Sequence, residues 1–365
     1  MPLLRLLSAL ALALLGAMPA VASAQAAGAQ GTDFLYNAVS GDTLIGLSSR
    51  YTLSPDHWRT LRQINHVADP AKLSIGKLIH IPFALIPEVA STANVTHVSG
   101  LAQIDGRPLA VGQKLGEGSI VTTGADGFAT LQLTDASVLT VPASSTLAIR
   151  RLRSFKGTGL VDAIMALKHG GIESSVAPRH TGVGRFEIRT PLSITGVRGT
   201  HLRVRNNARG AQSEVVRGRA LVASSRQDKT ATLHADQGTG VAPDGHILAI
   251  RKLLPAPALP KPERGGAAGW RMAFPAVPGA SAYLVRVATD AAVTRLVSTH
   301  TFSKPDVTFN APGAGTFYVA VRAVDPDGIE GNDAVRSFPG APVLTSSDGL
   351  PVLSGSGRPI LLSRY

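Results

Sequence analysis

Residues 118–141 read GSIVTTGADGFATLQLTDASVLTV. Apolar and polar side chains alternate over 128–133, and Asp126-Gly127 stands directly before that run. A period of two is typical of strands with one buried face, and an Asp-Gly pair favours a tight turn. We therefore expect consecutive short strands joined by tight turns in this part of the chain.

The same pattern continues around this stretch. Glycine separates short strand candidates at intervals of roughly ten residues, which predicts an all-β sandwich, jelly roll or solenoid. The pattern leaves these three architectures open. The further strand candidates are 146–149, 184–189, 202–205, 214–217, 220–223 and 232–235.

These residues resemble the FecR domain, which we place at 98–251. The best-known members of that family are membrane anti-sigma regulators whose periplasmic part senses an outer-membrane transporter. That role needs a cytoplasmic domain and a transmembrane helix, which we do not find in the sequence, so we expect only an envelope-side binding module to carry over. The matching pieces are Val98-Ser99-Gly100, Gly112-Gln113-Lys114-Leu115, 118–124, 131–135, 186–191 and 196–200.

The first 24 residues are expected to be a signal peptide. Arg5 precedes the apolar run 6–17, which is too short to span a bilayer, and Ala22-Ser23-Ala24 forms a cleavage site of small residues. We expect an exported protein that is periplasmic, associated with the cell envelope or secreted, with no transmembrane segment in the mature chain. The absence of Cys excludes disulfides and thiol-dependent activities.

Residues 34–82 show a different pattern, in the order strand, helix, helix, strand. Leu44, Leu47 and Tyr51 recur at helical spacing, and Asp42 is expected to cap that first helix. The expected buried side of the second helix consists of Trp58, Leu61 and Ile64.

This block resembles the LysM domain, which we place at 34–87. The matching pieces are Tyr36, 40–44, Leu47, Tyr51, Ile64-Asn65, Asp69-Pro70, Leu73, Gly76, Leu78 and Ile81-Pro82. The resemblance implies binding of N-acetylglucosamine polymers, such as peptidoglycan or chitin, between the first strand–helix loop and the loop before the last strand. The implied glycan-binding residues are Gly41, Asp42, Thr43, Leu44, Asp69, Pro70, Leu73, Ile75 and Gly76.

An N-acetyl group requires a backbone donor, a backbone acceptor and an apolar wall. Gly41 and Gly76 permit close approach of the backbone, and we expect Leu44 and Ile75 to supply the wall. Two positions depart from the family pattern, because Ile45 replaces a frequent aromatic residue and Ile75 a frequent proline. A single module of this kind is expected to bind weakly. The alternative is that 41–43 is only a capping turn.

Residues 270–338 again alternate and contain an early Trp270 and two strand tyrosines, Tyr283 and Tyr318. This pattern resembles the fibronectin type III sandwich, which we place at 269–340. The resemblance implies a spacer or adhesion module, with Tyr318 as a candidate tyrosine corner.

The formal charge of the chain is +12, and residues 179–229 contribute a net +8 of it. Export argues against nucleic acid as the partner and favours anionic wall or lipid phosphates. Arg203 and Arg205 alternate with Leu202 and Val204, so we expect both on an exposed strand face. Arg198 either binds an anion or holds backbone carbonyls. The candidate anion contacts are Arg198, Arg203, Arg205 and Arg209.

The sequence shows no pattern that predicts catalysis. None of its ten His residues forms a His-x-His or His-Glu-x-x-His motif, and a Gly-x-Ser-x-Gly elbow and a phosphate loop are missing. Glu173 has no paired carboxylate of the kind a glycosidase needs. We expect no metal site, no cofactor and no enzymatic activity.

We therefore predict a mainly β, multidomain, non-catalytic envelope protein that binds peptidoglycan. The alternative is a periplasmic sensor or signalling accessory whose FecR-like block binds an unidentified envelope protein. We expect 83–97 and the Pro-rich stretch 252–268 to be linkers between independent blocks, and 341–365 to be a tail. The molecule is then elongated, with few contacts between blocks.

Overall fold

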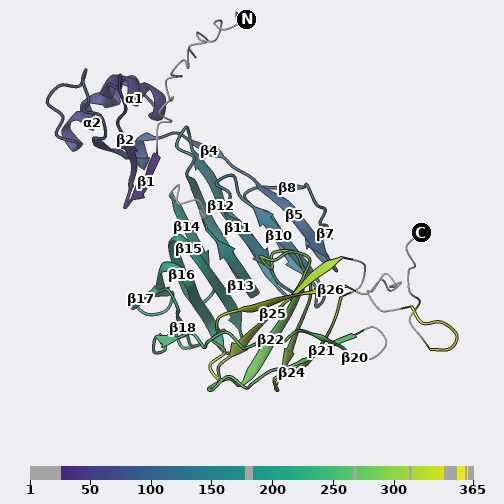
Figure 1. Ribbon diagram of the computed structural model, residues 1–365. Helices are drawn as coiled ribbons and strands as arrows, with labels where there is room; N and C mark the ends of the chain where they lie inside the picture. The colour runs from purple at the N-terminus through teal and green to yellow at the C-terminus, as the bar shows by residue number, and fades with distance from the viewer. Residues whose placement is uncertain are drawn as a thin grey trace, which may run out of the picture.

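The computed structural model describes residues 26–176, 184–265, 269–311, 315–340, 352–357 and 360. Within them the chain forms three units, which Figure 1 shows in the order of the chain: a small helical unit, a large β unit and a second β unit. The expected mainly β, multidomain fold is confirmed. The predicted signal peptide and most of the predicted tail lie outside the described residues.

The N-terminal unit is a three-stranded sheet, β1-β2-β3, covered by two helices. Its first strand pairs antiparallel with the second, from Gln30 opposite Asp33 to Ala26 opposite Tyr36, and the register shifts between Ala26 and Gly28. Residues 26–30 are therefore part of the folded unit. The elements are β1 Ala26–Gln30, β2 Asp33–Asn37, α1 Leu44–Tyr51, η1 Pro55–His57, α2 Trp58–Ile64, β3 Leu78–Pro82 and η2 Phe83–Leu85.

Helical spacing places one side of each helix in the core of this unit. Leu44, Leu47 and Tyr51 of α1 are buried, and the Tyr51 ring lies 5.2 Å from that of Phe34. On α2 only Leu61 is fully buried. Ile64, expected in the core, is 41% exposed, because the turn of an α-helix places it to one side of the buried Leu61.

The central β unit is built on one large sheet, and its buried residues form a larger hydrophobic cluster on the strands up to β15 and a smaller one around β16, β17 and β18. The order along the main path is β19-β18-β16-β15-β14-β13-β11-β10-β5-β8, and β12 pairs with β13, β4 and β9. The strands are β4 Glu88–Ala90, β5 Ala93–Ser99, β6 Ala102–Ile104, β7 Arg107–Pro108, β8 Lys114–Leu115, β9 Ile120–Thr123, β10 Phe128–Gln132, β11 Val138–Val141, β12 Thr146–Phe155, β13 Val161–Ser175, β14 Arg185–Arg189, β15 Ser193–Asn207, β16 Gly210–Ser224, β17 Thr230–His234, β18 Gln237–Val241 and β19 Arg251–Lys252.

The stretch 83–97 does not serve as a linker. It contains β4 and β5, which are paired into the large sheet, and Phe83, whose ring stacks on that of Phe155 at 4.2 Å. Phe155 and Leu160 of the central unit belong to the same hydrophobic cluster as the core of the N-terminal unit. The two units are therefore packed against each other, because apolar side chains on both sides exclude water from the boundary.

The third unit is a sandwich of two sheets, β20-β21-β24 and β23-β22-β25-β26. Its core contains Trp270, Val285, Val307 and Phe338. The hydroxyl of Tyr283, not that of Tyr318, accepts a hydrogen bond from a backbone N–H six residues upstream, at Val277. The strands are β20 Glu263–Gly265, β21 Gly269–Ala273, β22 Ala282–Ala288, β23 Leu296–Phe302, β24 Asp306–Asn310, β25 Thr316–Val324 and β26 Ala334–Pro339.

The Pro-rich stretch is packed rather than free. Leu253 and Leu259 are buried, the backbone oxygen of Leu254 accepts from Asn332 N at 2.8 Å, and that of Leu259 accepts from Arg336 Nε at 2.9 Å. The prolines keep the segment extended, and its leucine side chains pack against the sandwich. The expectation that 252–268 is a linker between independent blocks is therefore wrong for its described residues, 252–265.

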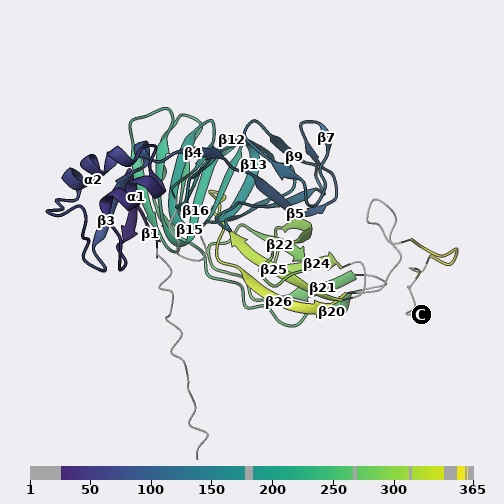
Figure 2. The ribbon, with the colours of Figure 1, turned by 90° about the horizontal axis from the view of Figure 1, so that it is seen from above.

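The sandwich also packs directly on the central unit, as Figure 2 shows from above. Phe128 of β10 is buried in a cluster with Val293 and Leu296 of the sandwich. Beside it, His97 Nε2 lies 2.7 Å from the backbone oxygen of Leu296. The expected elongated molecule with few contacts between blocks is contradicted at this boundary as well.

Candidate functional site

The two loops expected to hold a glycan do lie side by side in the N-terminal unit. Leu44 N donates to Pro70 O at 2.9 Å, and Gly76 N donates to Ala38 O at 2.7 Å. Thr43 caps α1, since its hydroxyl accepts from Gly46 N at 2.9 Å. These backbone bonds fix the distance between the loop 38–43 and the loop 69–76.

Asp42 was expected to cap the helix, and the structure gives it a different role. Its Oδ2 accepts from the Tyr36 hydroxyl and from Val39 N, both at 2.8 Å, so the carboxylate closes the first loop on itself. Burial of the phenol and the hydrogen bond to Asp42 raise the pKa of Tyr36 to about 12. Asp42 is buried, so it stabilises the conformation of the loop from its inner side.

The expected glycan-binding residues separate into two groups. Leu44 and Leu73 are buried in the core, so Leu44 cannot form the apolar wall that we expected of it. Ile75 is 74% exposed, and Ile45, which our reasoning did not include in the site, is also exposed. Helical spacing predicts the exposure of Ile45, because the residue that follows the inward-facing Leu44 on a helix points away from the core. The exposed or half-exposed members are Gly41, Thr43, Asp69, Pro70, Ile75 and Gly76.

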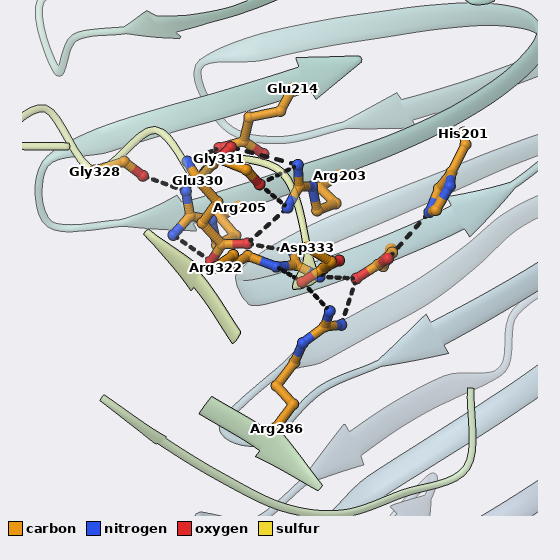
Figure 3. A network of polar contacts seen from close by, with 11 residues as sticks. His201, Arg203, Arg205, Glu214, Arg286, Arg322, Gly328, Glu330, Gly331 and Asp333 are labelled. Atoms are coloured by element: carbon orange, nitrogen blue, oxygen red, sulfur yellow. Dashed lines mark hydrogen bonds and ion pairs between the residues drawn. The ribbon is translucent and has the colours of Figure 1, made fainter. Parts of the chain in front are cut away.

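A second polar constellation lies at the junction between the central unit and the sandwich (Figure 3). Arg322 of β25 is almost completely buried and donates to three carboxylates. Its Nη1 lies 2.6 Å from Glu330 Oε2, its Nη2 lies 3.0 Å from Glu173 Oε2, and both Nε and Nη2 bond Asp333. Arg286 of β22 joins the same Glu173 and Asp333 at 2.9 and 2.7 Å.

The central unit contributes a cross-strand row to this network. Glu173, Arg203 and Glu214 are directly opposite one another on β13, β15 and β16. Arg203 donates twice to Gly331 O at 3.0 Å, and Arg205 bonds Glu214 and Glu330, each at 2.8 Å.

The expectation that Arg203 and Arg205 lie on a solvated face is therefore wrong. Arg203 is only 2% exposed and Arg205 is half-buried, since the sandwich covers the face of β15 that a free strand would expose. Arg209 is exposed, and the side chain of Arg198 lies outside the described residues. Of the basic stretch 179–229, Arg185 and Arg189 are also held in ion pairs, by Asp162 and Glu187.

The neighbouring guanidinium groups have the largest combined effect on the pKa values of two carboxyl groups in this network. Burial opposes ionisation of Glu330, but Arg205 and Arg322 outweigh it and lower the pKa of Glu330 to about 2. In the same way Arg286 and Arg322 outweigh burial and lower the pKa of Asp333 to about 2. Glu214 is the exception, because burial outweighs the attraction of Arg205 and raises its pKa.

The geometry of the network is that of a structural joint. Its carboxylates accept from guanidinium groups on both sides of the junction. Among the residues that the structure describes, no group of three or more His, Asp or Glu side chains is placed to hold a metal ion. Buried charges are retained when each is paired, so the network fixes the relative orientation of the two β units.

A comparison with known protein families finds a match within the central unit. Residues 119–221 match the FecR protein family. A comparison with curated protein sequences finds no match. The described part of the chain contains no helix that is both long enough and apolar enough to span a bilayer.

Three solved structures are similar to parts of the chain. A protein described as an anti-sigma factor from Parabacteroides distasonis is 15% identical with a TM-score of 0.30, over 36% of this chain and 59% of that chain. A protein named FN3tt is 17% identical with a TM-score of 0.21, over 25% of this chain and 97% of that chain. The extracellular domain of the one-component system BT4673 from B. thetaiotaomicron is 8% identical with a TM-score of 0.16, over 60% of this chain and 35% of that chain. At these TM-scores the matches do not define the fold of the whole chain.

Proposed function

We propose that this protein is a non-catalytic accessory of the cell envelope whose FecR-like central unit binds a protein partner. The observation that carries the proposal is the match of residues 119–221 to the FecR family, a stretch that includes β9 to β15 and most of β16. The task of the protein is recognition on the envelope side.

The packing of the three units supports a recognition role. A surface that binds a protein partner loses less free energy on association when it is already ordered. The FecR-like sheet is held at one end by Phe83 and Phe155 and at the other by the Arg322 network. We therefore propose that the flanking units act as rigid supports for the central sheet.

Site-specific photo-crosslinking in the full chain tests this proposal. A photoreactive residue at the exposed Val111 or Leu221 of the central unit should give a defined adduct with one envelope protein. The matched controls are Leu53 in the N-terminal unit and Val335 in the sandwich, which are also exposed and should give no such adduct. Adducts only from the controls, or none from any position, contradict the proposal.

The second candidate function is glycan binding by the N-terminal unit. The observation that favours it is the pairing of loops 38–43 and 69–76, which places Ile75 and the open positions of Gly41 and Gly76 on one exposed surface. We propose that an N-acetyl methyl group contacts Ile75. Peptidoglycan or a related N-acetylglucosamine polymer is the ligand class that the LysM resemblance implies.

Substitution of Ile75 separates this function from folding. Gly41 has φ +86°, so Gly41→Val would strain the backbone whether or not a sugar binds there. Ile75→Ser leaves the backbone unchanged and should weaken sedimentation of the full chain with purified peptidoglycan several-fold. Leu53→Ser, 67% exposed on the same unit but outside both loops, is the control. Equal loss in both variants, or no loss in either, contradicts glycan binding at these loops.

A further inference from the structure

The outer face of β14 to β17 presents two rows of side chains that the ion network does not use. By register, Glu187, Gly196, Leu221 and Thr232 lie opposite one another across the four strands. In the neighbouring outward row Arg219 lies opposite His234. The intervening residues, including Phe186, Ala220 and Leu233, point inward and are buried. The outward rows are thus a face of the central unit that stays accessible.

Gly196 is the unusual member of these rows. It stands inside strand β15 with a φ outside the left-handed region, and a Cβ built on it would meet no atom within 4 Å. Neither a turn nor crowding requires glycine there, and glycine inside a strand costs about 0.5–1 kcal/mol relative to alanine. Strand glycines often mark places where a ligand or another backbone approaches closely.

Gly196 lines a pocket of about 510 Å³, which we name the Gly196 pocket. Its volume lies within the range typical of ligand sites. One side is formed by Gly31, in the turn between β1 and β2 of the N-terminal unit, whose strands Figure 1 shows near the upper end of β14. The other lining residues used below are Arg185, Glu187, Leu221, Arg219 and Thr232.

The charges around the Gly196 pocket are unequal. Arg185 is held by Asp162 through two hydrogen bonds of 2.7 and 2.9 Å, and Glu187 is held by Arg189. Arg219 is exposed, and the ion pairs beside the pocket are made by Arg185 and Arg189 instead. Its neighbour across the strands, His234, cannot neutralise it. The positive charge of Arg219 therefore remains available near Leu221, which is 49% exposed.

We propose that the Gly196 pocket binds an extended acidic segment of the protein partner, with one apolar side chain over Gly196 and a carboxylate on Arg219. Leu221 and Arg219 are two residues apart on one strand, so the apolar and charged subsites are about 6.5–7 Å apart along the strand direction. Two residues of an extended peptide at positions i and i+2 have the same separation and face the same side. The proposal rests on the proposed function, since it names the recognition surface and the chemistry of the partner.

A labelled peptide tests this assignment on the full chain. The probe is a fluorescein-labelled, capped Thr-Leu-Thr-Asp-Thr peptide, and binding is followed by fluorescence anisotropy. Gly196→Val should weaken binding at least tenfold while leaving thermal stability equal or higher, because valine favours a strand and has open space there. Arg219→Gln should weaken binding about tenfold and reduce its salt dependence. Arg217→Gln is the matched control on the same strand, and it should change neither quantity.

Two results overturn the assignment. The first is equal affinity of the peptide for the wild-type chain and the Gly196→Val variant, and the second is no measurable binding to the wild-type chain. If the peptide does not bind but anionic phospholipid vesicles do, in a way that depends on Arg219 and not on Gly196, the ligand is a membrane surface and not a protein segment. An envelope protein that still crosslinks to the central unit of the Gly196→Val variant leaves the proposed function intact and contradicts only the pocket.

Discussion

Glu173 on β13 and Arg322 on β25 are 149 residues apart in sequence, and Glu173 Oε2 lies 3.0 Å from Arg322 Nη2. The pair joins the FecR-like sheet to the sandwich. Around it, Asp333 and Glu330 complete the acid partners of Arg322. The orientation of the two β units thus depends on charges that neither unit could bury alone.

Removal of Arg322 should strongly destabilise the protein. Arg322→Met leaves Glu173, Glu330 and Asp333 without their shared partner in a buried site, and breaking a buried pair costs about 3–5 kcal/mol. Urea unfolding measures the change in free energy of unfolding. Arg271→Met, which removes an exposed and solvent-screened pair with Asp306, should cost far less. An equal decrease in the free energy of unfolding for both variants would show that the buried network stabilises the protein no more than an exposed ion pair does.

Stability should fall in acid because of Glu330 and Asp333. Their folded pKa values, both about 2, lie below the ordinary values of 4.5 and 3.8, so the ionised forms are favoured in the folded state. Their contribution is present above pH 4.5 and is lost as pH falls toward 2. Unfolding curves between pH 7 and pH 2 measure it. Asp333→Asn should flatten this dependence, and an unchanged pH profile in that variant contradicts the prediction.

The boundary between the first two units should resist proteases. Phe155 packs on Phe83 and on the N-terminal core, so wild-type protein should be cut slowly within residues 83–97. Phe155→Ala should cost about 3–5 kcal/mol and speed cleavage there. Mass spectrometry of the fragments locates the cuts. Rapid cleavage of wild-type protein at this boundary would indicate that the units separate in solution.

The hydroxyl of Tyr283 should contribute to stability, and that of Tyr318 should not. Tyr283→Phe leaves the buried N–H of Val277 without its acceptor, which costs about 1–3 kcal/mol. Tyr318→Phe is the matched control, since no hydrogen bond of its hydroxyl is seen within the described residues, and its effect should stay within about 0.5 kcal/mol. Thermal unfolding of both variants measures the difference, and the reverse order would assign the corner to Tyr318.

The sequence by itself determined the local elements. The alternation over 128–133 predicted strand β10, and the spacing of Leu44, Leu47 and Tyr51 predicted α1. Such patterns are readable because each depends on residues a few positions apart, which share one face of a helix or strand. The mainly β class followed from repeating this local reasoning along the chain.

Only the tertiary structure decided which strand faces stay exposed. The alternation at Arg203 and Arg205 is the same whether the face of β15 that carries them meets water or the sandwich, and Glu330, which pairs with both, lies more than a hundred residues later. For the same reason the Pro-rich stretch could be read as extended but not as packed, and the pocket over Gly196 depends on strands and a turn from separate parts of the chain. Periodicity specifies the direction of a side chain, whereas its burial depends on what the rest of the chain places against it.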